Sequence, residues 1–163
     1  MAMPNCMYWA ERGRLAGSCM PRSMNELRAI RESGIRRIVV LPEDYEIEEH
    51  WDQPLPYFEA LAAFDLEFLH EPVPDMEPPT LGQLVEMLSW MEGTPTLVHC
   101  IGGIGRTGTV IASWLIVERG MSAREAVERV RSLRPGSVQS YAQMRFLLEV
   151  EGMVDEMRKM IRR

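Results

Sequence analysis

The sequence has few lysines, few cysteines and no long apolar run, and each scarcity argues against a class of protein. Lys159 is the only lysine among 163 residues, and 24 acidic against 18 basic side chains leave a formal net charge of -6. A net-acidic chain gains nothing from counterion release on DNA or RNA. We therefore expect no nucleic-acid partner.

The apolar segments are too short for a membrane. The longest is TVIASWLIV at residues 109–117, and the N-terminal residues MAMPNCMYWAERGR lack the apolar run of a secretory signal peptide. These absences predict a cytoplasmic protein that has no membrane partner.

The three cysteines are Cys6, Cys19 and Cys100, an odd number without the spacing of metal ligands. We therefore expect no disulfide framework, a reducing environment and no bound metal. A protective disulfide between Cys100 and either of the other two stays open as an alternative.

What is present fits one soluble domain over residues 1–163, with 46% apolar and 26% charged residues. Capping-box pairs mark four helix starts, and apolar stripes at helical spacing follow over residues 81–91 and 147–161. Short β-rich runs lie between helices at 35–41, 66–73 and 96–100, and residues 8–17 fit a hairpin that turns at 12–14. The four pairs are Ser23 with Glu26, Thr80 with Gln83, Ser122 with Glu125, and Ser140 with Gln143. After Gly108 the chain is predicted to be helical throughout.

Strands separated by helices predict an α/β fold, with a central, mostly parallel sheet of about five strands covered by helices on both faces. Ligands of such sheets lie beyond the carboxyl ends of the strands. Three loops should share that rim: PEDYEIEE after Leu41, PDMEPPT after Val73, and IGGIGR after the last core strand. The acidic run EDYEIEEHW, with Glu43, Asp44 and Glu46, is interpreted as a solvated loop, although one of its carboxylates could shape the pocket.

The third loop lies in VHCIGGIGRTGT at residues 98–109. Residues 103–108 match the G-x-G-x-x-G pattern of dinucleotide-binding turns, but the strand that should follow is replaced by helical sequence. The Gly-Lys-Ser/Thr of a nucleotide P-loop is absent as well. The loop therefore predicts no nucleotide cofactor.

The same loop fits an anion cradle around a nucleophile. Glycines let several N–H groups converge, and the helix that starts near Arg106 adds its positive dipole end. Arg106 can grip two phosphate oxygens with its planar fork, and Thr107 can donate a hydrogen bond to the sulfur of Cys100. The expected phosphate-binding residues are Ile101, Gly102, Gly103, Ile104, Gly105 and Arg106.

The segment HCIGGIGRT, residues 99–107, resembles the signature loop of the cysteine-dependent protein tyrosine phosphatases. The chain is most similar to small dual-specificity phosphatases of the VHZ type and their compact archaeal relatives. The LAGSCMP, VPD and RPGSV segments extend the resemblance over nearly the whole chain. It implies a protein phosphatase with Cys100 as nucleophile, a metal-independent phosphocysteine intermediate, and phosphate, vanadate or sulfate as loop anions.

The leaving oxygen needs a proton, and the best donor in the sequence is Asp75 in EPVPDMEPPT. Glu71 and Glu77 are its nearby rivals, and Asp75 could instead cap a turn. The resemblance implies that Asp75 then serves as base.

The resemblance also gives a role to two glutamines, because relatives orient the attacking water with glutamine. It nominates Gln139 and Gln143, although Gln143 is also the second member of the Ser140 capping box. His99 is expected to orient the loop backbone by hydrogen bonding.

Ile101 and Ile104 occupy positions where phosphoinositide-directed relatives carry lysine. An inositol lipid is therefore disfavoured, and a shallow site for phosphotyrosine, and also phosphoserine or phosphothreonine, in a protein or peptide is expected. Two alternatives stay open: a phospho-binding module that barely catalyses, and an RNA 5′-phosphatase of the same superfamily.

Overall fold

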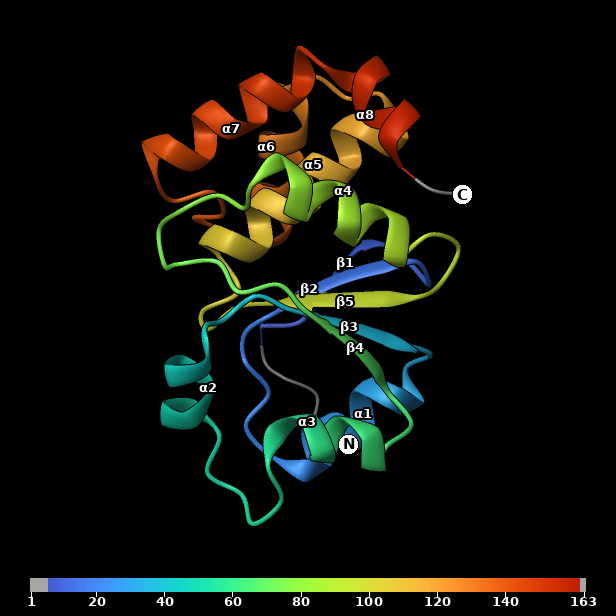
Figure 1. The fold of residues 1–163 in the computed structure, drawn as a ribbon, viewed down its shortest axis with the longest axis vertical. Helices are drawn as coiled ribbons and strands as arrows, with labels where there is room; N and C mark the ends of the chain where they lie inside the picture. Colours follow the sequence, from blue (N-terminus) through green and yellow to red (C-terminus); the bar gives the residue numbers. More distant parts are fainter. Residues whose placement is uncertain (1–5, 162–163) are drawn as a thin grey trace.

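A five-stranded sheet separates two layers of helices in the computed structural model, which describes residues 6–161 (Figure 1). The strand order is β1-β2-β5-β3-β4, with β1 and β2 antiparallel and every other pair parallel. The predicted α/β sheet and its N-terminal hairpin are therefore confirmed. The strands are β1 Tyr8–Glu11, β2 Leu15–Ser18, β3 Arg37–Val40, β4 Glu67–His70 and β5 Thr96–His99.

Strand β3 shows why the sheet is covered on both faces. Ile38 and Val40 pack into the core beneath α1 and α3, whereas Val39 and Leu41 pack into the core around α5. Successive side chains of a strand point to opposite faces, so a strand buried on both sides is a continuous apolar run. One layer holds α1 Met24–Glu32, α2 Asp44–His50 and α3 Tyr57–Ala63; the other holds α4 Leu81–Trp90, α5 Gly105–Arg119, α6 Ala123–Leu133, α7 Tyr141–Glu151 and α8 Val154–Met160 (Figure 1).

Helix α5 is the centre of its layer. Every residue from Gly105 to Val117 is buried, and the helix contacts α4, α6, α7, α8, β2 and β5. A helix that is largely apolar on all sides is stable only when it is surrounded in this way. The loop before α5 is therefore anchored to the most enclosed element of the fold. No helix between residues 6 and 161 is long and apolar enough to cross a bilayer.

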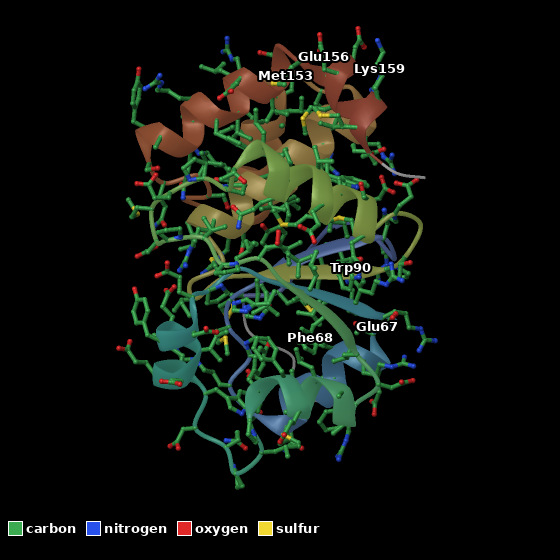
Figure 2. The ribbon with its side chains drawn as sticks, viewed as in Figure 1. Glu67, Phe68, Trp90, Met153, Glu156 and Lys159 are labelled. Atoms are coloured by element: carbon green, nitrogen blue, oxygen red, sulfur yellow. A yellow bond between two sulfur atoms is a disulfide. The ribbon has the colours of Figure 1, made fainter. Side chains whose placement is uncertain are left out.

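Edge strand β4 exposes part of its apolar surface. Phe68 points toward the α1 and α3 layer (Figure 2) and stacks on Phe58 of α3, with ring centroids 4.6 Å apart. Glu67 of the same strand pairs with Arg37 of β3 at 3.2 Å. The stacking covers part of the Phe68 ring, and the ion pair joins β4 to β3.

Two secondary-structure predictions were wrong. The stripe over 147–161 is not one helix, because α7 ends at Glu151 and α8 begins at Val154 after a break at Gly152 and Met153. The acidic run is not a loop, because residues 44–50 form helix α2. Ile47 and Trp51 are spaced i, i+4 and are both buried, and their burial explains why this charged segment is helical.

The cysteines also differ from both expectations, no disulfide framework and a protective disulfide with Cys100. Cys6 and Cys19 form a disulfide with a Cα–Cα distance of 5.7 Å, and Cys100 is a free thiol. The two cysteines thus pair with each other and not with Cys100. The odd cysteine count therefore gives no support to a reducing environment.

Candidate active site

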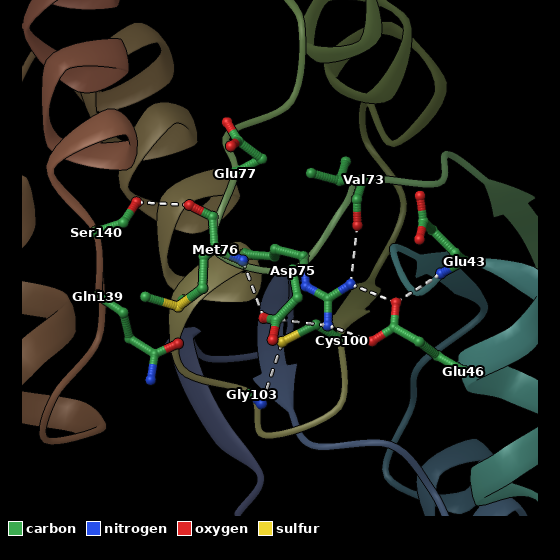
Figure 3. A network of polar contacts seen from close by, with 12 residues as sticks. Glu43, Glu46, Val73, Asp75, Met76, Glu77, Cys100, Gly103, Gln139 and Ser140 are labelled. Atoms are coloured by element: carbon green, nitrogen blue, oxygen red, sulfur yellow. Dashed lines mark hydrogen bonds and ion pairs between the residues drawn. The ribbon is translucent and has the colours of Figure 1, made fainter.

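The three loops expected on one rim meet around Arg106 (Figure 3). The Arg106 guanidinium donates to Glu46 of α2 and to the carbonyl oxygen of Val73 in the segment after β4. The shared pocket has a volume of about 400 Å³, and both Cys100 and Asp75 line it. Parallel strands that end at the same edge thus bring together three segments that are far apart in sequence.

Cys100 lies directly after β5 and is 3% exposed. Its Sγ accepts a hydrogen bond from the Gly103 N–H at 3.2 Å, and α5 begins two residues later at Gly105. The sulfur therefore lies inside the curl of the signature loop, residues 100–106, close to the N-terminus of a buried helix. Both features stabilise negative charge on the sulfur or on an anion beside it.

The carbonyl groups of the signature loop are held from outside. A trans peptide points its C=O and the following N–H in opposite directions. The amides of Ile101, Gly102, Gly103 and Gly105 are therefore directed inward, and the bond from Gly103 to the sulfur agrees with this. The four contacts are His99 Nδ1 with Cys100 O at 2.8 Å, Met20 N with Ile101 O at 2.9 Å, Arg134 Nη2 with Gly102 O at 3.0 Å, and Val138 N with Ile104 O at 3.1 Å.

Gly103 is required by its backbone conformation. Its φ is +71°, and a Cβ atom at this position would lie 2.6 Å from backbone atoms of Ser18 and Cys19. Gly102 differs, since its nearest neighbour would be a side-chain carbon of Ile104 at 3.8 Å. The positive φ and the close approach to the end of β2 both exclude any side chain at Gly103.

Glu46 fixes the orientation of Arg106. The two side chains form a bidentate pair at 2.8 and 2.9 Å, and both residues are buried. Burial alone would raise the pKa of Glu46, but the hydrogen bonds from Arg106 and the Glu43 N–H, together with the charges of Arg106 and His50, outweigh it and lower that pKa. Burial would likewise lower the pKa of Arg106, and the Glu46 carboxylate raises it instead. Both groups are therefore charged, and the remaining N–H groups of Arg106 are available to an anion.

The sequence prediction missed this role of Glu46. The acidic run was interpreted as solvated, with one of its carboxylates left open as a pocket residue. The i, i+4 pair Ile47 and Trp51 was the available signal, because it predicts a helix whose buried face lies next to Glu46. No sequence pattern indicated that the partner would be Arg106, 60 residues away.

His99 supports the loop as a neutral side chain. It is fully buried, and burial lowers its pKa to about 4. In the neutral ring Nδ1–H donates to the Cys100 carbonyl oxygen, and Nε2 accepts from the Tyr57 hydroxyl at 2.8 Å. This placement suits the expected role in orienting the backbone.

Asp75 lies at the mouth of the pocket, with a side chain that is 65% exposed. Its Oδ1 accepts from the Met76 N–H at 3.0 Å and lies 3.7 Å from Nη2 of Arg106. The rivals Glu71 and Glu77 do not line this pocket. Of the three carboxylates, Asp75 is therefore the one that shares the pocket with Cys100.

The two candidate glutamines differ in position. Gln139 lines the pocket, and its Oε1 would lie 2.5 Å from a Cβ atom placed on Gly105. Gln143 is fully buried, accepts from the backbone N–H groups of Gln139 and Ser140, and donates to the Glu77 carbonyl oxygen at 3.2 Å. Gln143 therefore ties the start of α7 to the Asp75 segment, and Gln139 is the better placed of the two to contact a water.

Thr107 is buried directly after Arg106. Its hydroxyl makes no hydrogen bond to another described residue, so the expected bond to the sulfur is not formed in this structure. Between residues 6 and 161, no group of three or more His, Cys, Asp and Glu side chains is arranged to hold a metal ion.

Comparison with known proteins identifies this arrangement. Residues 4–147 match the family model described as "Swiss Army Knife protein, DSP-PTPase phosphatase domain". The chain belongs to the dual-specificity protein tyrosine phosphatase family. The resemblance seen in the HCIGGIGRT segment is therefore confirmed.

Individual relatives agree with this family. Tk-PTP in its active form is 39% identical, has a TM-score of 0.79 and is matched over 92% of this chain and 99% of its own. PTPMT1 in complex with PI(5)P is 20% identical with a TM-score of 0.77, over 93% of this chain and 98% of its own, and shows the same fold. The tyrosine-protein phosphatase cdc-14 of Caenorhabditis elegans is 54% identical over 41 residues, which are 25% of this chain and 6% of that protein. The chain spans less than half the length of the first curated relatives it matches.

Proposed function

We propose that this phosphatase hydrolyses phosphotyrosine in proteins or peptides, and also phosphoserine or phosphothreonine, through a phosphocysteine intermediate. One observation carries the proposal: Cys100, inward amides and an Arg106 held by Glu46 share one pocket with Asp75. Family membership makes it a phosphatase. The amino-acid preference rests on the shape and charge of this pocket.

In the first step the Cys100 thiolate attacks phosphorus in line with the leaving oxygen. The S–P bond forms as the P–O bond breaks, and Asp75 gives its proton to the departing oxygen. Charge on the three equatorial oxygens is stabilised by Arg106 and the loop amides. These fixed positive groups do the work that a metal ion does elsewhere, so the reaction needs no metal or cofactor.

In the second step water attacks the phosphocysteine. Asp75, now a carboxylate, takes a proton from that water as the P–S bond breaks, and inorganic phosphate and the Cys100 thiolate are released. Gln139 lines the same pocket and would orient the water through its amide.

The test is a substrate panel with Cys100→Ser as the blank. It contains phosphotyrosine, phosphoserine and phosphothreonine peptides, a phosphoinositide and a triphosphate-ended RNA, all assayed in EDTA. We expect hydrolysis of phosphotyrosine peptides, inhibition by vanadate and no turnover by Cys100→Ser. Asp75→Asn should lower kcat on poor leaving groups by roughly 10²–10⁴.

Other outcomes would point elsewhere. Peptide binding without turnover would favour a phospho-binding module, and preference for the RNA would favour a 5′-phosphatase. PTPMT1 was solved with PI(5)P, so preference for the lipid would move this chain toward that chemistry. Full activity of Cys100→Ser would overturn the mechanism. Cytoplasmic location stays a prediction that cell fractionation would check.

A further inference from the structure

Helix α2 is locked to the phosphoryl site. Glu46 holds Arg106 through two hydrogen bonds, and the His50 Nδ1 lies 2.8 Å from the Glu46 carbonyl oxygen within the same helix. Ile47 of α2 and Trp51, which follows the helix, are buried in the core between the sheet and helices α1 and α3. The backbone of α2 is therefore held in place relative to Arg106 and the signature loop.

Two α2 side chains at that wall are not used by the proposed chemistry. Tyr45 and Glu49 line the pocket together with Cys100, and their i, i+4 spacing puts them on one face of the helix. Tyr45 is a large aromatic side chain that is 55% exposed. Figure 3 shows Gln139 and the α2 residue Glu46 on opposite sides of Cys100, so α2 lies on one side of the pocket and Gln139 on the other.

Charged side chains of both signs line this mouth. Arg106 is the only Arg or Lys among the described residues that line the pocket, and Glu46 already pairs with it. Glu49 is exposed and makes no ion pair with a described residue. Asp75 is also at the rim, but as the proton donor of the first step it is neutral when the substrate binds. Glu49 is therefore the carboxylate at this mouth that is free to pair with a positive charge of the substrate.

We propose that α2 selects the substrate: Tyr45 packs on the ring of a phosphotyrosine, and Glu49 pairs with an arginine or lysine next to it in the peptide. The proposal rests on the phosphotyrosine activity proposed above. The ring of a phosphotyrosine can pack against Tyr45, whereas the short aliphatic side chain of phosphoserine cannot. The Glu49 carboxylate attracts a basic residue next to the phosphotyrosine and repels an acidic residue or a polyphosphorylated ring.

The charge half is tested by measuring kcat/KM for matched phosphotyrosine peptides. A single arginine or a single glutamate is moved through the three positions on either side of the phosphotyrosine. The wild type should prefer arginine at one or more of these positions, and the preference should weaken at high salt. The quantity compared is the kcat/KM for the arginine peptide divided by the kcat/KM for the matching glutamate peptide, both measured with the same enzyme variant. Changes in the overall activity of a variant cancel in this ratio.

The variants are Glu49→Gln, Glu49→Arg and the control Glu48→Gln. Glu48 is the adjacent exposed carboxylate, and it lines a separate cavity between α2 and α3. Glu49→Gln should reduce the ratio about 1.5- to 5-fold, the range for an exposed ion pair. Glu49→Arg should invert the preference, and Glu48→Gln should keep the wild-type ratio.

The aromatic half is tested with phosphotyrosine and phosphoserine versions of one peptide. Tyr45→Ala should reduce the phosphotyrosine-to-phosphoserine ratio about 2- to 12-fold, and Tyr45→Phe should keep it because the ring remains.

The two levels of the proposal fail in different ways. Equal turnover of arginine and glutamate peptides by the wild type, or an unchanged ratio in Glu49→Arg, overturns the role of Glu49. An unchanged ratio in Tyr45→Ala overturns the role of Tyr45. No turnover of any phosphotyrosine peptide, with p-nitrophenyl phosphate still hydrolysed, would instead show that the proposed function is wrong.

Discussion

The pairing of Glu46 with Arg106 makes a quantitative prediction for Glu46→Gln. The wild-type carboxylate accepts two charge-assisted hydrogen bonds at 2.8 and 2.9 Å, between residues that are 6% and 2% exposed. Such bonds are each worth about 1.5–3 kcal/mol. Glutamine keeps the volume and one acceptor but turns an NH₂ group toward the guanidinium. The variant therefore loses at least one of these bonds and the charge.

If the orientation of Arg106 matters mainly in the transition state, a loss of about 2–3 kcal/mol lowers kcat about 30- to 150-fold. Glu46→Asp keeps the charge but shortens the reach, so its kcat should lie between those of the wild type and Glu46→Gln. Activity is measured with p-nitrophenyl phosphate and with a phosphotyrosine peptide. The assay temperature is kept well below the melting temperature of each variant, as determined by circular dichroism.

Glu48→Gln is the matched control, because it removes a charge from the same helix without touching Arg106. Its kcat should equal that of the wild type. A folded Glu46→Gln variant with kcat within threefold of the wild type would refute the reasoning, since Arg106 would then need no fixed partner.

Three further predictions follow from the same structure. Gly103→Ala should abolish activity and lower the melting temperature, because a Cβ there meets backbone at 2.6 Å, while Gly102→Ala should keep the fold; equal melting curves for the two variants would contradict this. Burial lowers the pKa of His99 from 6.5 to about 4, so the unfolded chain binds the extra proton between these values and the unfolding free energy should fall by about 3 kcal/mol as the pH drops from 6.5 to 4. Urea titrations at each pH should show a smaller fall in unfolding free energy for His99→Asn than for the wild type. If the unfolding free energies of the two proteins depended equally on pH, the effect could not be assigned to His99. Burial and the Glu86 carboxylate raise the pKa of Glu71, so its contribution to stability is lost as the pH rises through that pKa. Glu71→Gln should therefore be more stable than the wild type at pH 8 and show no gain at pH 4, and a gain at both pH values would point to packing.

Local sequence determined much of the architecture. Apolar runs bounded by helical segments predicted the parallel sheet, because a strand that is buried on both faces consists almost entirely of apolar residues. The boundaries moved inward, for example from 35–41 to Arg37–Val40, although the Leu41 N–H still donates to the His99 carbonyl oxygen at 3.1 Å. The capping pairs at Thr80, Ser122 and Ser140 all form, because each bond joins residues three positions apart.

The signature loop could also be identified from the sequence. Cys100, Gly103 and Arg106 lie within seven consecutive positions, so the chemistry of the cradle is encoded in one short segment. The sulfur contact with Gly103 spans only three residues.

Tertiary structure decided the rest. It paired Cys6 with Cys19, turned the acidic run into helix α2, and brought Glu46 to an arginine 60 positions away. The disulfide and the pair of Glu46 with Arg106 leave no local pattern, because their partners lie in different segments and the distance between them depends on how the chain packs. The sequence by itself pointed to Cys100 and its loop. Only the fold decided that a carboxylate of α2 orients Arg106 and that Tyr45 and Glu49 line the pocket. The reason is that a side chain on a helix becomes part of a site only when packing turns its face of the helix toward that site.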